Sequence, residues 1–331
     1  MRITHARGHG AAVKTFWLFT VIFAAIFTLQ SSAHAQVTVA QISDTHLGEV
    51  HSPHAAENLR RVVDMLNARH PDAVILSGDI GENPEQWQRA RQILKNLNAP
   101  LYYAPGNHDV HTNDVAQYRS VFGPDYYRFQ VKGVTFLVID SQLLGNYDQF
   151  GLQTLQPMPA ETEAEGEKML AWLGHGADQD RHQGKDKKHK HDRNEDDASQ
   201  STDESQRAVD QQDAEHRDKD GDDRGKKIII GIQHIPAYRA ENLLPDNKPY
   251  WVITDPYRSR EMDLLHKLGV KHMLVGHWHV GGVFERDDIT WHVAPSTSRL
   301  LPWSHDLGFA MHTISPDGDV KTEFVSIGGA E

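Results

Sequence analysis

The chain has 331 residues, enough for one large domain or two small ones, and 38% of them are hydrophobic. Its formal net charge of -12 argues against specific nucleic acid binding. It contains no cysteine, which excludes disulfides, cysteine–zinc sites and thiol nucleophiles, whereas its 22 histidines leave room for metal sites built on imidazole.

The first 35 residues are typical of an export signal. Basic residues precede an apolar stretch over residues 16–29, and the small residues Ala33 and Ala35 then predict cleavage after Ala35. The apolar stretch is shorter than the ~20 residues that span a bilayer, so cleavage is favoured over an uncleaved anchor. We therefore expect a signal peptide over residues 1–35, export to the periplasm or the medium, and no stable membrane span after cleavage.

Beyond the signal, strand and helix patterns alternate. Strands are expected at residues 37–42, 73–76, 101–104, 126–131, 134–139, 228–232 and 272–275. Helices are expected at residues 55–68, 84–97, 161–173 and 258–268. Later short strands near residues 283, 290–293, 309–314 and 320–327 are expected to be antiparallel. This order predicts an α/β fold, a four-layer α/β/β/α sandwich of two mixed sheets, with parallel strands mainly in its first half.

The composition changes between about residues 177 and 227. This stretch consists of Asp, Lys, Arg, Gln, His and Ser, with almost no apolar side chains. Such a segment buries too little surface to offset the entropy lost on ordering. We predict a disordered charged insertion at 177–227, which interrupts a single domain over residues 36–331.

Five short polar segments each follow an apolar run of strand length. They are Asp44-Thr45-His46, Gly78-Asp79, Gly106-Asn107-His108-Asp109, His234-Ile235-Pro236 and Gly276-His277-Trp278-His279. Their donors are carboxylates, imidazoles and one amide oxygen, a set that suits two Mn, Fe or Zn ions. Side chains two residues apart in an extended segment face the same side, so the members of each Asp-x-His or His-x-His pair can share a site.

Taken singly, most of these segments have ordinary explanations. Asp44 with His46 fits a polar loop, Asp79 fits a helix cap, and His234 fits a hydrogen-bonded core histidine. Gly-Asn-His-Asp is the most specific segment. In it, His108 can reach a substrate, and Asp109 can accept a hydrogen bond from the His108 ring and raise its basicity. We predict that His108 and Asp109 are catalytic.

The order of the five segments resembles the calcineurin-like metallophosphoesterase superfamily, from about residue 37 to the C-terminus without the insertion. Residues 118–127 and 136–142 resemble the calcineurin-like phosphoesterase domain-containing group, which includes small serine/threonine phosphatases. The resemblance implies one ion held by Asp44, His46, Asp79 and His279, and a second held by Asp79, Asn107, His234 and His277. It also implies in-line attack by a metal-bound hydroxide, with His108 stabilising the transition state or protonating the leaving oxygen.

The motifs of this chain differ from those of two branches of the superfamily. The large protein phosphatases carry Gly-Asp-x-x-Asp-Arg-Gly and Gly-Asn-His-Glu, whereas residues 78–84 contain no arginine and the later motif ends in Asp109. Purple acid phosphatases place a tyrosine ligand three residues after the bridging aspartate, where this chain has Glu82. A purple iron–tyrosinate site is therefore not expected.

The expected function is hydrolysis of phosphomonoesters, with a phosphorylated small molecule or a phosphoprotein as substrate. A phosphodiesterase or nucleotidase of the same fold is an open alternative. A non-catalytic metal- or phosphate-binding protein is a second one. Because neither His108 nor Asp109 is needed merely to hold ions, their presence favours an enzyme. The metal and the oligomeric state stay open.

Overall fold

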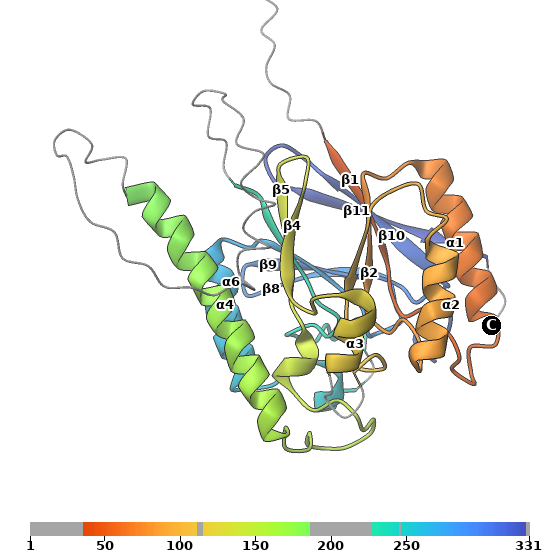
Figure 1. Ribbon diagram of the computed structural model, residues 1–331, viewed down its shortest axis with the longest axis horizontal. Helices are drawn as coiled ribbons and strands as arrows, with labels where there is room; N and C mark the ends of the chain where they lie inside the picture. The colour runs from red at the N-terminus through yellow and green to blue at the C-terminus, as the bar shows by residue number, and fades with distance from the viewer. Residues whose placement is uncertain (1–35, 111–114, 186–226, 245, 329–331) are drawn as a thin grey trace, which may run out of the picture. The chain divides into compact units, whose positions relative to one another are not determined.

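Two mixed β-sheets form the centre of the fold (Figure 1). The computed structural model describes residues 36–110, 115–185, 227–244 and 246–328. The strands are β1 (Val37–Ile42), β2 (Ala73–Ser77), β3 (Leu101–Ala104), β4 (Tyr127–Val131), β5 (Val134–Val138), β6 (Ile229–Ile232), β7 (His272–Val275), β8 (Gly282–Arg286), β9 (Ile289–Val293), β10 (Gly308–Ile314) and β11 (Val320–Ser326). The helices are α1 (Ala55–Arg69), α2 (Pro84–Leu94), α3 (Val115–Phe122), α4 (Ala160–Lys185) and α6 (Tyr257–Leu268), with 3-10 helices η2 (Ser141–Leu144) and η3 (Pro249–Trp251).

The strand order confirms the predicted pair of mixed sheets. One sheet has the order β11-β10-β1-β2-β3, and the other has the order β4-β5-β6-β7-β9-β8. The neighbours from β1 to β3 are parallel, as are those from β5 through β6 and β7 to β9. The remaining pairs, β1 with β10, β10 with β11, β4 with β5 and β8 with β9, are antiparallel, so β9, which was expected to be antiparallel, has a parallel neighbour in β7 as well.

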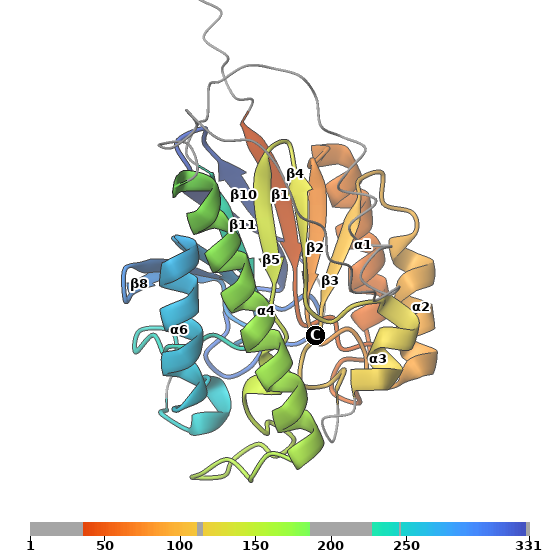
Figure 2. The ribbon, with the colours of Figure 1, turned by 60° about the vertical axis from the view of Figure 1, so that its left-hand side comes forward.

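The helices cover the outer faces of the two sheets. Figure 2 shows α1 and α2 on one side and α4 and α6 on the other, with both sheets between them. The alternation along β2 explains the layering: Ala73 and Ile75 belong to the core between the sheets, whereas Val74 and Leu76 belong to the core that includes the helices. This alternation is the period of two that a strand imposes on its side chains.

Three helices differ from the sequence prediction. The helix α3 was not predicted, because its eight residues bury only Val115 and Tyr118 and so give a weak periodic signal. The helix α2 ends at Leu94 rather than 97, because the N–H of Leu97 bonds the carbonyl of Leu94 in a tighter turn.

The helix α4 continues to Lys185, so residues 177–185 extend a helix instead of beginning the insertion. Once a helix is nucleated on a packed segment, it can propagate through polar residues at little cost. The rest of the predicted insertion, residues 186–226, and the predicted signal peptide, residues 1–35, lie outside the described residues. Within the part of the chain that is described, no helix is both long and apolar enough to cross a membrane.

Candidate dinuclear metal centre

The loops that follow five strands bring the seven predicted ligands together. Asp44 and His46 follow β1, Asp79 follows β2, Asn107 follows β3, His234 follows β6, and His277 and His279 follow β7. All seven are buried, with exposed fractions between 0% and 6%. A buried cluster of carboxylates and imidazoles is costly unless its members are paired or bind a cation.

Five of these ligands have a backbone conformation that non-glycine residues rarely adopt. They are Asp44, His46, Asp79, His277 and His279, with φ between 41° and 71°. Such a conformation costs roughly 1–3 kcal/mol per residue and persists only where the surroundings enforce it. The Ser296 and Ser298 hydroxyls both donate to the carbonyl of Asp44, at 2.9 and 2.8 Å. The backbone strain is thus concentrated at the ends of the site-bearing strands.

Glycines allow the loops to approach one another closely. Gly78 has a φ of +95°, and a Cβ there would lie 2.5 Å from the His234 ring. A Cβ on Gly106 would lie 2.2 Å from Asp79 Oδ1. Both separations are far below van der Waals contact, so any larger residue would displace a ligand.

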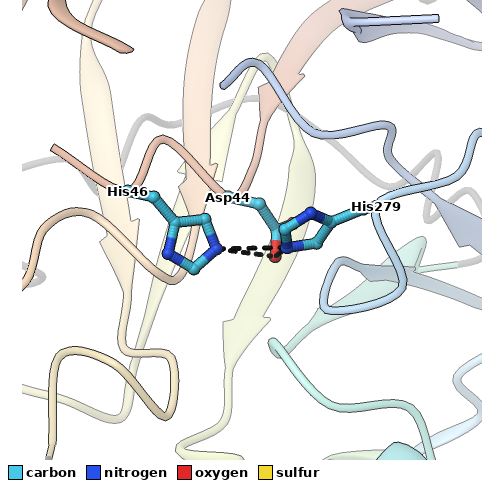
Figure 3. Close-up of side chains that lie close together, drawn as sticks. All are labelled: Asp44, His46 and His279. Carbon is cyan, nitrogen blue, oxygen red and sulfur yellow. Dashed lines mark hydrogen bonds and ion pairs between the residues drawn. The ribbon is translucent and has the colours of Figure 1, made fainter. Parts of the chain in front are cut away.

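Asp44, His46 and His279 form one ligand group (Figure 3). Asp44 Oδ1 lies 3.2 Å from His279 Nε2 and 3.9 Å from His46 Nε2. The other ring nitrogen of each histidine is already engaged, because His46 Nδ1 donates to Glu82 at 3.3 Å and His279 Nδ1 donates to the carbonyl of Arg299 at 3.0 Å.

The two Nε2 atoms of this group lie 3.1 Å apart. With both Nδ1 atoms acting as donors, each neutral ring presents a lone pair at Nε2, so neither can donate to the other. A shared cation is the simplest partner for two facing lone pairs and a carboxylate. Partners of this kind at the second ring nitrogen fix the tautomer that a metal requires.

Asp79, His234 and His277 form a second group. His234 Nδ1 donates to the carbonyl of Ser77 at 2.7 Å, and His277 Nε2 donates to the carbonyl of Tyr250 at 2.9 Å. The free ligand atoms are therefore Nε2 of His234 and Nδ1 of His277.

Asn107 completes the second group. Its Nδ2 donates to the Tyr250 hydroxyl at 2.9 Å, whereas its Oδ1 is buried and has no hydrogen-bond partner among the described residues. The amide is thus held with its oxygen available to a cation, as the sequence predicts for a neutral oxygen ligand.

Asp79 lies between the two groups. Its Oδ2 is 3.5 Å from His46 Nε2 and 3.1 Å from His234 Nε2, one histidine from each group. Its Oδ1 accepts the backbone N–H of His108 at 2.9 Å, which fixes the orientation of the carboxylate. This is the geometry expected of a carboxylate that bridges two ions.

The electrostatics of the site favour cations. Burial opposes the ionisation of Asp44 and Asp79, yet nearby histidines, His279 for Asp44 and His234 for Asp79, lower both pKa values. Burial also opposes the charged form of His234, but Asp79 and Asp44 outweigh it and raise its pKa to about 9. Burial, together with His234, lowers the pKa of His277 to about 3. The field that draws a proton to His234 would equally draw a metal cation.

Three buried atoms test whether a metal pair fits. Asp44 Oδ1, Asn107 Oδ1 and His234 Nε2 have no hydrogen-bond partner in the described structure. Such atoms are normally satisfied, and each one here is an oxygen or nitrogen ligand that transition metals accept. The residues therefore fit two ions, the first at Asp44, His46, Asp79 and His279, the second at Asp79, Asn107, His234 and His277.

His108 stands beside the ligands, and its partner is Glu82. His108 Nδ1 lies 3.1 Å from Glu82 Oε2, while His46 Nδ1 lies 3.3 Å from Glu82 Oε1. One carboxylate thus orients both a predicted ligand and the predicted catalytic histidine. Burial would raise the pKa of Glu82, but the hydrogen bonds from His108 and His46 lower it to about 2. Sequence reasoning missed this role, and its only signal was the place of Glu82 three residues after Asp79.

The carboxylate of Asp109 engages backbone N–H groups, whereas the His108 ring bonds Glu82 and not Asp109 as predicted. Asp109 Oδ1 accepts the N–H groups of Ile80 and Gly81, at 2.8 and 3.3 Å, and its Oδ2 accepts the N–H of Gly106 at 2.9 Å. The side chain therefore joins the loop after β2 to the loop after β3. Adjacency in sequence did not reveal this, because the turn directs neighbouring side chains to different sides.

Comparison with known proteins agrees with this geometry. A model of the family described as "Calcineurin-like phosphoesterase" matches residues 37–281, more than half of the chain. The chain belongs to the calcineurin-like phosphoesterase family. Dinuclear metal sites characterise this family, in agreement with the two ligand groups that share Asp79.

Two curated relatives of this phosphoesterase illustrate the range of the family. The chain is 42% identical over 80 residues to the glycerophosphodiester phosphodiesterase GpdQ of Enterobacter lignolyticus (strain SCF1), covering 22% of this chain and 29% of the relative. It is 24% identical over 249 residues to the serine/threonine-protein phosphatase CPPED1 of Bos taurus, covering 71% of this chain and 62% of the relative. The chain thus spans less than two thirds of either relative.

Solved structures show the same fold. A dimetal phosphatase from Danio rerio matches with a TM-score of 0.52 at 14% identity, covering 88% of this phosphoesterase and 99% of that chain. GAP50, the anchor in the inner membrane complex of Plasmodium, matches with a TM-score of 0.53 at 16% identity, covering 89% and 86%. At such identities the likeness supports the architecture alone.

Proposed function

We propose that this phosphoesterase hydrolyses phosphomonoesters at its two-metal centre. The observation that carries the proposal is Asp79 Oδ2, which lies within 3.5 Å of one histidine from each ligand group, with His108 beside it. When bound, two ions would neutralise phosphoryl oxygens and lower the pKa of a water molecule. The chain's own part is to hold the ligands rigidly and to supply a proton donor.

His108 is the proposed proton donor. It lines the same cavity as His46, Asp79 and His279, and 28% of its side chain is exposed. Burial would lower its pKa, but Asp79 and Glu82 outweigh burial and raise the pKa to about 9. A protonated ring held by Glu82 at the edge of the cavity can give its proton to the leaving oxygen as the phosphorus–oxygen bond breaks.

The preference for monoesters rests on the longer of the two relationships. The match to the serine/threonine-protein phosphatase covers 71% of the chain, whereas the match to the glycerophosphodiester phosphodiesterase covers 22%. The second match is nevertheless the more identical, so diester hydrolysis is the second candidate. A phosphomonoester, a phosphodiester and a phosphopeptide, offered at equal concentration to protein loaded with Mn, Fe or Zn, would separate the candidates.

The metal requirement has a direct test. Elemental analysis of protein expressed with added metal should find about two equivalents per chain, because eight ligand positions form two sets that share Asp79. Asp79→Asn should reduce the content of both ions, and His46→Ala mainly that of one. One equivalent or none in the wild type would count against the site.

The role of His108 separates an enzyme from a metal-binding protein. His108→Ala should retain both metals and the unfolding temperature, while turnover on an alkyl phosphate falls by ~10²–10⁴. The exposed His305→Ala serves as the control. Loss of metal from the His108 variant would make this residue a ligand or a structural support, and full activity would remove its catalytic assignment.

We also propose export through a cleaved signal at residues 1–35. In support, β1 begins at Val37, so cleavage after Ala35 would remove no part of the described fold. N-terminal sequencing of the purified protein should read from Gln36, and a sequence that starts at Met1 would contradict the proposal.

A further inference from the structure

The cavity above the metal centre has an aromatic wall that hydrolysis itself does not require. The cavity measures about 220 Å³, and His46, Asp79, His108, His277 and His279 line it on the metal side. The other lining residues are Phe150, Tyr250, Trp251, Arg299, Leu301 and Trp303. One continuous space therefore contains both the reaction centre and an apolar surface.

Hydrogen bonds hold the rings of this wall in place. Trp251 Nε1 donates to Asp246 at 2.7 Å, Trp303 Nε1 donates to the carbonyl of Trp278 at 3.0 Å, and the Tyr250 hydroxyl accepts from Asn107. Because the N–H groups of Trp251 and Trp303 are already engaged, ring carbon is what these two side chains offer to a ligand.

Phe150 extends the wall to the surface. It is 61% exposed and packs edge-to-face against Tyr250 and Trp251, with ring centroids 5.3 and 5.5 Å apart. The Trp251 and Trp303 rings are 5.4 Å apart at 87°, so the wall presents ring surfaces in more than one orientation. Phe150 thus carries the aromatic surface from the cavity to the solvent, where a ligand can reach it.

The two ends of the cavity differ in the charge of the side chains that line them. Arg299 adds a permanent positive charge to the lining, and its own carbonyl holds the predicted ligand His279. Its side chain is 35% exposed and forms a loose 3.6 Å pair with Glu49, so it can also contact a phosphate oxygen. The rings of the aromatic wall carry no charge themselves and offer few hydrogen-bonding groups to a sugar or a glycerol group, although Lys248 Nζ lies 4.9 Å from the centroid of the Phe150 ring at the outer end.

We propose that the preferred substrates are phosphate esters whose alcohol carries a flat apolar ring, which packs against Phe150, Trp251 and Trp303. Apolar cavities of roughly 150 Å³ accept benzene, so a cavity of about 220 Å³ has room for one ring and a phosphate group. The inference rests on the proposed function. Water still adds to phosphorus, the bond to the alcohol oxygen breaks, and that oxygen takes the proton.

Three substrates separate the contribution of the ring to binding from the reactivity of the leaving group. Benzyl, cyclohexylmethyl and 2-methylpropyl phosphate release alcohols of similar basicity, but only the first carries a flat ring. We expect kcat/KM for benzyl phosphate to exceed the other two by about tenfold, the size expected of one good aromatic contact. Benzylphosphonate, which is not hydrolysed, should bind more tightly than 2-methylpropylphosphonate by a similar factor in calorimetry.

Phe150→Leu is the principal variant, because Phe150 makes no hydrogen bond that would disturb the ligands. It should bring the ratio of kcat/KM for benzyl phosphate to that for 2-methylpropyl phosphate to within about threefold. Trp303→Leu should lower the same ratio, and because it also removes the hydrogen bond to the carbonyl of Trp278, between His277 and His279, its metal content is measured alongside. Phe324→Leu, at an aromatic residue 40% exposed and outside this cavity, is the matched control and should change nothing.

The outcomes separate this inference from the proposed function. Equal kcat/KM values for the three phosphates would overturn the ring site and leave the phosphatase intact. A benzyl preference that survives in Phe150→Leu and Trp303→Leu would overturn the assignment of the wall. If no phosphate were hydrolysed but benzylphosphonate still bound selectively, the proposed function would fail and the ring site would stand. Failure of both measurements would overturn both.

Discussion

At the scale of single residues, Glu82 connects binding to chemistry. Its two oxygens accept from the Nδ1 atoms of His46 and His108, so the same carboxylate sets the tautomer of a predicted ligand and the orientation of the proposed proton donor. A glutamine has one acceptor oxygen and one NH₂ group, and it cannot accept from both rings. Replacement of this one side chain should therefore affect both functions.

Glu82→Gln should shift the alkaline limb of the pH profile. The pKa of His108 is raised in part by the charge of Glu82, and a proton donor is active below its pKa and is lost as pH rises through it. Removing that charge lowers the pKa, so kcat on an alkyl phosphate should decline at lower pH than in the wild type. The exposed Glu57→Gln is the control. An unshifted limb would show that Glu82 does not act on His108.

Asp109 should behave as a structural residue. An asparagine keeps one acceptor and would turn an NH₂ group toward a backbone N–H of Ile80 or Gly106, leaving a buried donor unpaired. We expect Asp109→Asn to lower the free energy of unfolding by roughly 1–3 kcal/mol, measured by chemical denaturation, and to loosen metal binding. Asp64→Asn on the exposed side of α1 should be neutral. Unchanged stability with reduced turnover would instead support a catalytic role.

The sequence identified the side chains of the site more reliably than the hydrogen-bond partners of those side chains. All seven ligands follow strands, and the strand end is visible in a run of apolar residues, so their convergence could be predicted. The partner of His108 could not, because the direction of a side chain after a turn depends on backbone angles such as the φ of 55° at Asp79. Glu82 and the Tyr250 carbonyl were missed for the same reason, since neither belongs to a local pattern.

At the scale of elements, a chain of polar side chains joins the two sheets. His272 on β7 bonds His292 on β9 at 3.1 Å, and His292 Nδ1 lies 2.7 Å from Thr322 Oγ1 on β11. Thr322 Oγ1 lies 2.9 Å from His312 Nδ1, and His312 Nε2 lies 3.0 Å from Gln41 Oε1 on β1. Because Gln41 Oε1 can only accept, His312 donates to it from Nε2 and accepts from the Thr322 hydroxyl at Nδ1. Thr322 then accepts from His292, which accepts from His272, so all donors in the chain point toward Gln41.

This network should make the packing of the sheets sensitive to acid. Burial lowers the pKa of His292 from 6.5 to about 3, so between these values the unfolded chain binds a proton that the folded chain does not. Stability is therefore present above pH 6.5 and is lost as pH falls toward 3, by roughly 2 kcal/mol between pH 7 and pH 5.

His292→Leu should remove that dependence. The variant should be less stable at pH 7, because the Thr322 hydroxyl loses its donor, but the deficit should shrink by roughly 2 kcal/mol at pH 5. Urea denaturation at the two pH values measures the difference, with the exposed His305→Leu as control. A deficit that stays constant with pH would show that His292 does not titrate on unfolding.

Element prediction succeeded where the sequence carries a clear local pattern, either a continuous apolar run, as in a strand buried on both faces, or one apolar face of a helix. The strands β1 and β2 and the helix α1 carry clear patterns and appear within a residue or so of the predicted bounds. The helix α3 buries two side chains and is held by its neighbours rather than by its own periodicity, so local sequence does not reveal it. Which strands pair across β1 and β10 also depends on contacts distant in sequence.

At the scale of the whole molecule, the charged segment, residues 186–226, separates two elements of the fold in the sequence. It lies between α4, whose Leu170 and Leu173 are buried, and β6, a central strand of the second sheet. Both flanking elements are therefore anchored independently of the segment. The composition of residues 186–226 provides no apolar pattern that could contribute to either core.

Replacing residues 186–226 with a short Gly/Ser linker should leave the fold and the site intact. Shortening a connection changes the entropy of loop closure only slightly, so the unfolding temperature, the metal content and turnover on a small phosphate ester should match the full chain. A longer deletion, back to residue 170, is the matched control and should destabilise the protein, because it removes Leu170 and Leu173 from contact with the core. Loss of soluble expression in the shorter deletion would assign the segment a structural role. Unchanged turnover on the small ester with reduced turnover on a phosphopeptide would instead show that the segment selects larger substrates.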